Sequence, residues 1–490
     1  MKFRLTRKNY PLIIISILGI VLIAYTTSRA FLLSLTHDES FTYLWYVHES
    51  FMQIISMHIP KANNHILNSI AIKFLTWIFP ANEFVVRLPN LIAHIAYIVF
   101  SILILKKYRN PVLIIGGFIL LNFNPYMLEF FSLARGYGIS LALLTGSVYF
   151  FLQFIEKEKQ QFIYFPFILG ALSAISNLIY IHFYLALLIT YNIIKINNIL
   201  SFRCFKERLS SFFRINIPSI IVTTTLALIV FEPIRKLSKY NELYGHGNIS
   251  FYQDTIITFI NSSKYTQDYG SFTAEKISYL LLGLIMILII TALFDLFKKK
   301  FLIRDSKLSI FLCLLLLPVL SIIMQHQILG SEYPSIRLTL FFVPLLGFSI
   351  IAFYIHYKNR VIKYFSLFII SLLAFLLAFH TLNSMQFKYA SEWKYDADTK
   401  EMTNILKNEV LKNCPGKQVK LGINWIFEPT INFYRITKDY DWLQQVTRDG
   451  LTGDYDYYYI LKENLPEIKN VEILKEFKTS NTLLLKKVEK

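Results

Sequence analysis

Residues 11–43 read PLIIISILGIVLIAYTTSRAFLLSLTHDESFTY, an apolar segment followed by a polar turn. The apolar part, up to about residue 33, is long enough to cross a bilayer, which takes about 20 mostly apolar residues. The acidic pair Asp38–Glu39 comes directly after it. Water and lipid headgroups solvate a carboxylate at a membrane boundary, so the pair is stable there and can act on a molecule held in the lipid.

The rest of the chain repeats this apolar pattern. It has 490 residues, of which 54% are hydrophobic, as in a multi-pass membrane protein. A shorter apolar piece, 66–80, favours an interfacial or re-entrant helix over a span. Apolar lengths and basic flanks predict eleven spans, at about 11–33, 86–105, 111–127, 138–155, 162–178, 180–196, 214–231, 277–296, 308–327, 337–356 and 361–382.

The formal charge of +18 belongs almost entirely to the membrane part. Residues 385–490 hold 17 Lys and Arg against 16 Asp and Glu, which leaves +17 for residues 1–384. Basic side chains gather in loops at 106–109, 195–214, 298–307 and 358–363, which the positive-inside rule assigns to the cytoplasm. We therefore expect a cytoplasmic N-terminus in the cell (inner) membrane, an extracytoplasmic C-terminus, and no nucleic-acid partner.

The composition changes near residue 385, where charges of both signs alternate and apolar runs shorten. We expect two parts, a helical membrane domain at 1–384 and a soluble extracytoplasmic α/β domain at 385–490. In the second part the pattern predicts a helix at 396–413 and strands at 419–423, 455–461, 471–477 and 482–486. Cys204, Cys313 and Cys414 lie in three separate regions, which predicts neither an intramolecular disulfide nor a metal site built on cysteine.

The predicted topology places many polar side chains on the outer side. Each has an ordinary structural alternative: an arginine can anchor a span end, a histidine can be a hydrogen-bonded core residue, Glu129 can pair with Arg135, and the two asparagines can form a turn. Because so many polar side chains are predicted on one side of the membrane, they also suggest a functional site there. The residues are Asp38, Glu39, Asn63, Asn64, His65, Arg87, Glu129, Arg135, Tyr137, His182, His326, Glu332 and Arg337.

Acids, histidines and arginines beside an apolar helical bundle suit a substrate that has both a phosphate and a polyisoprenoid tail. Guanidinium groups stabilise the charge of a departing phosphate, and a carboxylate can deprotonate an acceptor hydroxyl. The sequence has no Gly-rich phosphate loop of the nucleotide-binding type. A nucleotide sugar is in any case cytoplasmic, whereas the predicted site is outside.

Several of these residues occur in short motifs that resemble a known family. In this order the motifs look like those of integral membrane GT-C glycosyltransferases of the protein O-mannosyltransferase and lipid A aminoarabinose transferase type, over roughly the first 350 residues. The motifs are Asp38–Glu39, Phe84-x-x-Arg87-Leu88-Pro89, Arg135-x-Tyr137, His182–Phe183 and Arg337–Leu338. The chain departs from the family at two places: relatives often have Pro-Pro-Leu or His-Pro-Leu where this chain has Asn64-His65-Ile66-Leu67, and many have His-Tyr where it has His182–Phe183. These departures weaken any assignment of the substrate.

The resemblance implies a GT-C fold and an inverting transfer of a sugar from a polyprenyl-phosphate donor to an acceptor at the outer leaflet. It implies catalytic roles for Asp38, as the base, and for Glu39, its neighbour in the motif. Arg135 and Arg337 become phosphate or substrate contacts. The acceptor is a protein, a lipid or a glycan, and outer acidic residues can hold a divalent cation although no ligand spacing requires one. The remaining substrate-binding candidates are His65, Arg87, Glu129, Tyr137, His182 and Glu332.

Two other functions remain open from the sequence. An envelope polysaccharide polymerase or ligase would also use outer arginines and histidines but needs no early Asp–Glu pair. A transporter of lipid-linked sugars would carry ionisable residues near the bilayer midplane, often with internal repeats. The predicted span interiors are nearly free of charge and no repeat is visible, which favours an enzyme.

Overall fold

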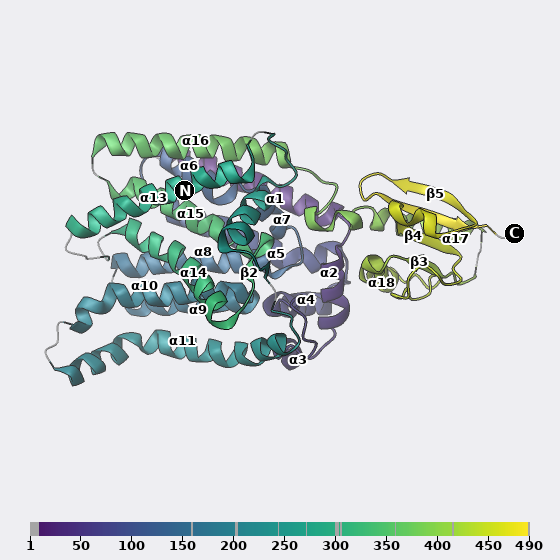
Figure 1. Cartoon of the computed structure of the whole chain (residues 1–490), viewed down its shortest axis with the longest axis horizontal. Coiled ribbons are helices and arrows are strands. Elements are labelled where there is room, and N and C mark those ends of the chain that lie inside the picture. The colour runs from purple at the N-terminus through teal and green to yellow at the C-terminus, as the bar shows by residue number, and fades with distance from the viewer. Residues whose placement is uncertain are drawn as a thin grey trace, which may run out of the picture.

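The computed structural model describes residues 9–157, 160–200, 204–243, 245–270, 272–298, 303, 306–357, 359–413 and 416–488. Parts of the predicted cytoplasmic loops, and Cys414, lie outside these residues. Figure 1 shows a large bundle of roughly parallel helices with a small α/β part at one end. The prediction of a helical multi-pass fold with a small C-terminal α/β region is confirmed.

Nine helices in the described part of the chain are long and apolar enough to cross a membrane, or ten when one bent pair is counted as a span. The chain is therefore an integral, multi-pass membrane protein. Large apolar side chains on α13 and α16, such as Phe297 and Phe375, stay exposed as a lipid-facing surface would require. The nine contain α1 (Tyr10–Leu32), α5 (Glu83–Leu105), α8 (Gly136–Lys157), α10 (Ile181–Leu200), α11 (Phe205–Lys239), α13 (Ala274–Lys298), α14 (Lys307–Leu329), α15 (Phe342–His356) and α16 (Arg360–Ser384). The spans at α10 and α15 also include the 3₁₀ turn before each helix, so they run over Leu178–Ile196 and Ile336–His356.

Two of the eleven expected spans have an irregular form. The expected span at 111–127 is the bent pair α6 (Pro111–Asn122) and α7 (Pro125–Phe131), whose axes differ by 65°. The expected span at 162–178 is α9 (Tyr164–Ser176), whose 13 residues are followed by a short 3₁₀ turn, Leu178–Tyr180. An α-helix of that length reaches only about 20 Å, less than the hydrocarbon thickness of a typical bilayer.

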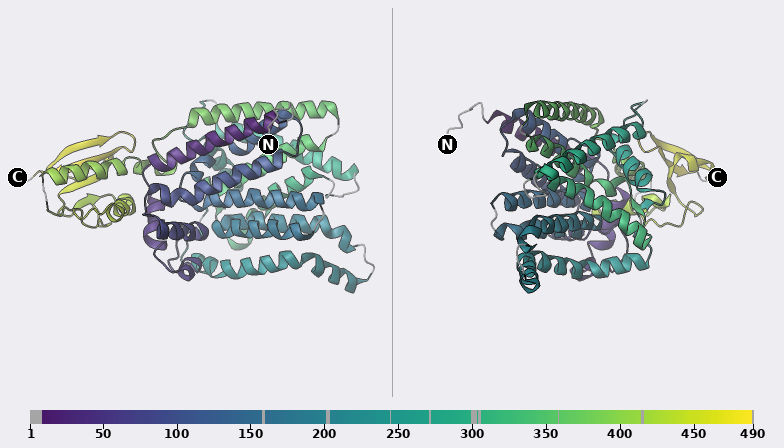
Figure 2. Two further views of the ribbon diagram at one scale, coloured as in Figure 1. Left: turned by 180° about the vertical axis from the view of Figure 1, so that it is seen from behind. Right: turned by 60° about the vertical axis from the view of Figure 1, so that its left-hand side comes forward.

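Short elements cover the end of the bundle that faces the α/β part (Figures 1 and 2). They are α2 (His37–Phe41), the π-helix η1 (Thr42–Tyr46), α3 (Phe51–Ile55) and α4 (Ile66–Ile78). The short strands β1 (His246–Gly247) and β2 (Tyr333–Pro334) form an antiparallel pair, although α13 and α14 lie between them in the chain. η4 (Phe251–Ile257) and α12 (Thr258–Lys264) follow β1. The apolar piece predicted at 66–80 is α4, which has 13 residues.

The C-terminal part is a four-stranded sheet of order β3-β4-β6-β5 with helices α17 (Thr399–Asn413) and α18 (Glu428–Thr437). β3 (Leu421–Ile423) runs parallel to β4 (Tyr457–Leu461), whereas β6 (Thr482–Lys487) is antiparallel to β4 and to β5 (Val471–Phe477). Each predicted strand overlaps an observed one. We keep the division at residue 385 as a prediction, because residues 386–396 bind side chains of the helical part.

Candidate functional site

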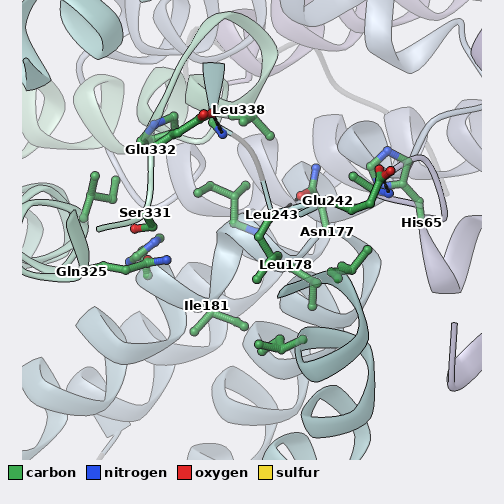
Figure 3. A pocket seen from close by; sticks show the side chains of 18 of the residues that line it. His65, Asn177, Leu178, Ile181, Glu242, Leu243, Gln325, Ser331, Glu332 and Leu338 are labelled. Carbon is green, nitrogen blue, oxygen red and sulfur yellow. Dashed lines mark hydrogen bonds between the residues drawn. The ribbon is translucent and has the colours of Figure 1, made fainter. Parts of the chain in front are cut away.

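A cavity of about 600 Å³ lies at the end of the bundle next to the α/β part. One wall is polar and carries Asp38, Arg135 and Arg337. Many apolar lining side chains come from α10, α11 and α14, such as Leu185, Leu237 and Ile328. Figure 3 shows polar and apolar side chains around the same space, with Glu332 and His65 beside Leu178 and Ile181. The cavity therefore suits a molecule with a charged head and an apolar tail.

Asp38 is the carboxylate at the polar wall. It lies in the first turn of α2, where the side chains of Thr36 and Glu39 form a capping box that begins the helix after the first span. Asp38 Oδ2 lies 3.1 Å from a guanidinium nitrogen of Arg135 and 3.7 Å from one of Arg337. Burial raises the pKa of this carboxyl, but the two arginines outweigh it and hold the pKa below its usual value. Asp38 is therefore ionised at neutral pH.

Glu39 and Arg87 point away from the cavity and bind each other, so their predicted catalytic and substrate-binding roles do not fit the geometry. Arg87 donates to both carboxylate oxygens of Glu39, at 2.8 and 2.7 Å, and both side chains are fully buried. Arg87 also donates to the carbonyls of residues 30, 33 and 34, which lie in the last turn of α1 and directly after it. The pair fixes α2, and hence Asp38, on the bundle.

Arg135 and His65 come from the loops before α8 and α4. Arg135 donates to the side chain of Asn63, and the ring of His65 meets that of Tyr137 edge-on with centroids 5.0 Å apart. A Cβ at Gly136 would lie 2.4 Å from the carbonyl oxygen of Ser176 and 2.7 Å from the His65 side chain, so only glycine fits. His65, Arg135 and Tyr137 all line the cavity, as predicted for substrate-binding residues.

Arg337 lies just after β2, and its partners come from the segment that follows the last span. Ile336 has a positive φ of 50°, a strained backbone for a β-branched residue, directly before Arg337. Arg337 pairs with the carboxylate of Glu392 and lies 5.2 Å from the ring centroid of Trp393. Trp393 also hydrogen-bonds the Asp38 side chain. Sequence reasoning missed Glu392 and Trp393, because no local motif links them to Asp38.

Glu129 is buried outside the cavity, which is not where a substrate-binding residue is expected. Its carboxylate accepts a hydrogen bond of 2.9 Å from Arg29, a residue of α1, and another from the Tyr265 hydroxyl. Ser391 donates to it through both its backbone N–H and its hydroxyl. The sequence alternative that paired Glu129 with Arg135 is wrong, because Arg135 pairs with Asp38. An arginine inside an apolar span was the signal for Arg29, since such a charge has to be paired.

His182 and Glu332 line the cavity, whereas His326 does not. His182 Nδ1 lies 2.8 Å from the Ser321 hydroxyl. Glu332 accepts hydrogen bonds from the backbone N–H groups of Gly245 and His246, at 2.9 and 2.8 Å, so it closes the loop that carries them over the cavity. His326 binds the carbonyl of residue 331 and stacks on Tyr333, which is the ordinary core alternative.

Neither metal nor disulfide chemistry gathers in the described residues. In those ranges, no three His, Cys, Asp or Glu side chains are arranged to hold a metal ion. Cys204 and Cys313 are free thiols.

No family model matches the chain, and no curated protein sequence matches it. Among similar solved structures is ArnT from Cupriavidus metallidurans in the apo state, at 9% identity over 96% of this chain and 97% of that one, with a TM-score of 0.48. The same protein bound to undecaprenyl phosphate has 8% identity over 98% of both chains and a TM-score of 0.47. The arabinosyltransferase EmbB from Mycobacterium smegmatis has 11% identity over 79% of this chain and 42% of its own, with a TM-score of 0.36.

Proposed function

We propose that this protein transfers a sugar from a polyprenyl-phosphate donor to an acceptor at the outer face of the cytoplasmic membrane, with Asp38 as the general base. The observation that supports it is an ionised carboxylate, held between two arginines, in a cavity that is also lined by many apolar side chains. A phosphate with an isoprenoid tail matches both kinds of lining. The outer position follows from the basic loops, which belong on the cytoplasmic side.

The arginines are suited to the leaving group of this reaction. Arg135 and Arg337 approach the same oxygen of Asp38, so a phosphate that enters beside Asp38 can reach both guanidinium groups. Charge-assisted hydrogen bonds from arginine become stronger as negative charge develops on the departing phosphate. The apolar side chains of α10, α11 and α14 would hold the first isoprene units.

The chemical step needs one base. The acceptor hydroxyl oxygen forms a bond to the anomeric carbon of the sugar while the bond from that carbon to the phosphate oxygen breaks. The proton of the hydroxyl passes to Asp38, and polyprenyl phosphate leaves. A single displacement of this kind inverts the configuration of the anomeric carbon. A phosphate bound to the arginines also weakens their pull on Asp38, which raises the pKa of Asp38 and makes it a stronger base while the donor is bound.

The first test compares wild type with Asp38→Asn in purified protein reconstituted in lipid, with polyprenyl-phosphate sugars from native membranes as donors. Release of free polyprenyl phosphate is measured. We expect a loss of at least about 100-fold in Asp38→Asn, since a general base contributes about 10²- to 10⁴-fold. Asp268→Asn, on an exposed loop away from the cavity, is the matched control and should keep full activity.

Three results would count against this function. Equal release by wild type and Asp38→Asn would remove Asp38 from the chemistry. Dependence on Arg135 and Arg337 without dependence on Asp38 would favour a polysaccharide polymerase or ligase. Movement of the lipid-linked sugar across sealed vesicles, with no glycosidic bond formed, would favour a transporter.

A further inference from the structure

Three buried polar atoms on described residues that line the cavity have no hydrogen-bond partner. One is Nε of Arg135, whose other guanidinium nitrogens bind Asp38 and Asn63. The other two are Nε2 of His65 and the side-chain nitrogen Nδ2 of Asn177, on residues that are only 6% exposed. Burying a polar atom without a partner costs about 1–3 kcal/mol, so such atoms normally have one. His65 and Asn177 are both drawn in the close view of the cavity (Figure 3).

His65 is held so that Nε2 is an acceptor. Its ring is hydrogen-bonded to the backbone of Ser176, and since Nε2 has no partner, this bond uses Nδ1–H. Burial, followed by the positive charges of Arg135 and Arg337, lowers the pKa of His65 well below its usual value. The imidazole is therefore neutral, with a lone pair on Nε2. The close approach of Gly136 and the edge of Tyr137 fix the ring in place.

Asn177 supplies the opposite kind of group, a donor. It lies where α9 ends early, and its side-chain oxygen accepts the backbone N–H of Ile179 at the start of the following turn. That contact fixes which end of the amide is the oxygen, so the NH₂ group is the end without a partner. The break after Ser176 thus brings both groups together, since Ser176 binds His65 and Asn177 is the next residue.

The charged groups around these two atoms already have partners. Among the described lining residues, Asp38 is paired with two arginines and Glu242 with Lys61. Glu332 accepts two backbone N–H groups of the covering loop. A positively charged sugar would therefore find no available carboxylate and would lie close to two arginines. A negatively charged sugar would face the lone pair of His65 and would lie beside the phosphate of its own donor, which binds the two arginines.

We propose that His65 and Asn177 form the sugar subsite of this cavity and select a donor whose sugar is uncharged and bears hydroxyl groups. This proposal rests on the proposed function and adds the class of sugar to it. A hydroxyl donates to His65 Nε2, and a sugar oxygen accepts from Asn177 Nδ2. The phosphate of the same donor binds Arg135 and Arg337.

Equilibrium binding tests the proposal without turnover. Full-length protein in lipid nanodiscs is titrated with four polyprenyl phosphates in competition with a labelled one: without a sugar, and with a neutral hexose, an amino sugar bearing a free ammonium group, or a uronic acid. We expect the neutral hexose to bind about tenfold or more tightly than either charged sugar, because a mismatched buried partner costs that much.

Two variants locate the effect. His65→Phe keeps an aromatic ring against Tyr137 but removes the acceptor, so it should weaken binding of the hexose donor about tenfold and leave the sugar-free lipid phosphate unchanged. Asn177→Asp keeps the cap of the turn and adds a negative charge, so it should shift the preference towards the amino sugar. Asn110→Asp, which caps α6 outside the cavity, is the matched control and should change no ratio.

The results separate this proposal from the proposed function. Charged sugars that bind as tightly as the hexose, or a hexose affinity that His65→Phe leaves unchanged, would overturn the subsite. Selective hexose binding without transfer to any acceptor would overturn the transferase and leave the subsite standing. No binding of any sugar-bearing donor would overturn both.

Discussion

At the scale of single residues, the pKa of Asp38 is held down against burial chiefly by Arg135 and Arg337. A hydrogen bond from Trp393, which lies far away in the sequence, contributes a smaller part in the same direction. A lowered pKa means that the carboxylate stays ionised as the pH falls from 7 until well into the acid range. Activity that needs ionised Asp38 should therefore be insensitive to pH from about 7 to about 5, as far as this group is concerned.

Trp393→Phe should move the acid limb of the kcat/KM profile to higher pH. The substitution removes a donor to the charged form, which raises the pKa of Asp38, while the arginines and the aromatic packing remain. Steady-state rates from pH 4 to 8 measure the shift. Trp442→Phe is the control, since the Trp442 N–H has no hydrogen-bond partner in the structure. An acid limb at the same pH in wild type and Trp393→Phe would show that Trp393 does not act on Asp38.

Residue identity alone could predict part of this site. An acidic pair after the first span, and arginines on the same outer side, indicated Asp38, Arg135 and Arg337 before any coordinates. Glu392 and Trp393 could not be found, because a tertiary contact between the first loop and the segment after the last span leaves no local pattern. Glu39 looked catalytic because sequence shows that two carboxylates are adjacent but not that they point in different directions.

At the scale of elements, the buried pair Glu39–Arg87 joins α1, α2 and α5. Each partner removed alone leaves an unpaired buried charge, which costs about 3–5 kcal/mol. We therefore expect Glu39→Gln and Arg87→Gln each to lower the free energy of unfolding by several kcal/mol. The double variant should lose clearly less than the sum, because neither charge then remains.

Denaturation in mixed detergent micelles measures this cycle. The exposed pair Glu232–Arg235 on α11 is the matched control, and Arg235→Gln should change stability little. Additive losses in the double variant would mean that Glu39 and Arg87 stabilise the protein independently. A normal stability in Glu39→Gln with lost activity would return Glu39 to the chemistry.

The spans could be predicted, but their breaks were missed. Long apolar runs locate helices in a chain like this one, because backbone groups in lipid need internal partners. Both breaks carry a short local signal inside such a run: Asn124 caps α7, which begins with Pro125, and Asn177 caps the turn after α9. The breaks shape the site, since the first carries Glu129 to Arg29 and the second places Asn177 at the cavity.

At the scale of the whole molecule, the C-terminal part holds the first outer loop in place. The N–H of His37 donates to Asp396 at 2.7 Å, and the N–H of Leu35 donates to the Tyr434 hydroxyl at 3.0 Å. The α/β part therefore lies at the end of the bundle that carries α2 (Figure 1), and Asp38 of α2 lines the cavity. The sequence predicted the folds of both parts but not this contact. The local pattern of strands and helix in the C-terminal part predicts its secondary structure, but it does not show which residues of the helical part it contacts.

This arrangement makes the membrane orientation testable with two thiols. Cys204 is exposed at the start of α11, beside a basic loop predicted to be cytoplasmic, and Lys478 is exposed after β5 in the C-terminal part. Two variants of the protein, each with a single cysteine, are labelled in intact cells with a membrane-impermeant maleimide. Lys478→Cys should be labelled directly, and Cys204 only after permeabilisation. If both positions were labelled without permeabilisation, residues 204 and 478 would lie on the same side of the membrane. That result would contradict the topology predicted from the basic loops. The reverse pattern would place Asp38 and the cavity on the cytoplasmic side, where nucleotide sugars are available, and would remove the main argument for a polyprenyl-phosphate donor.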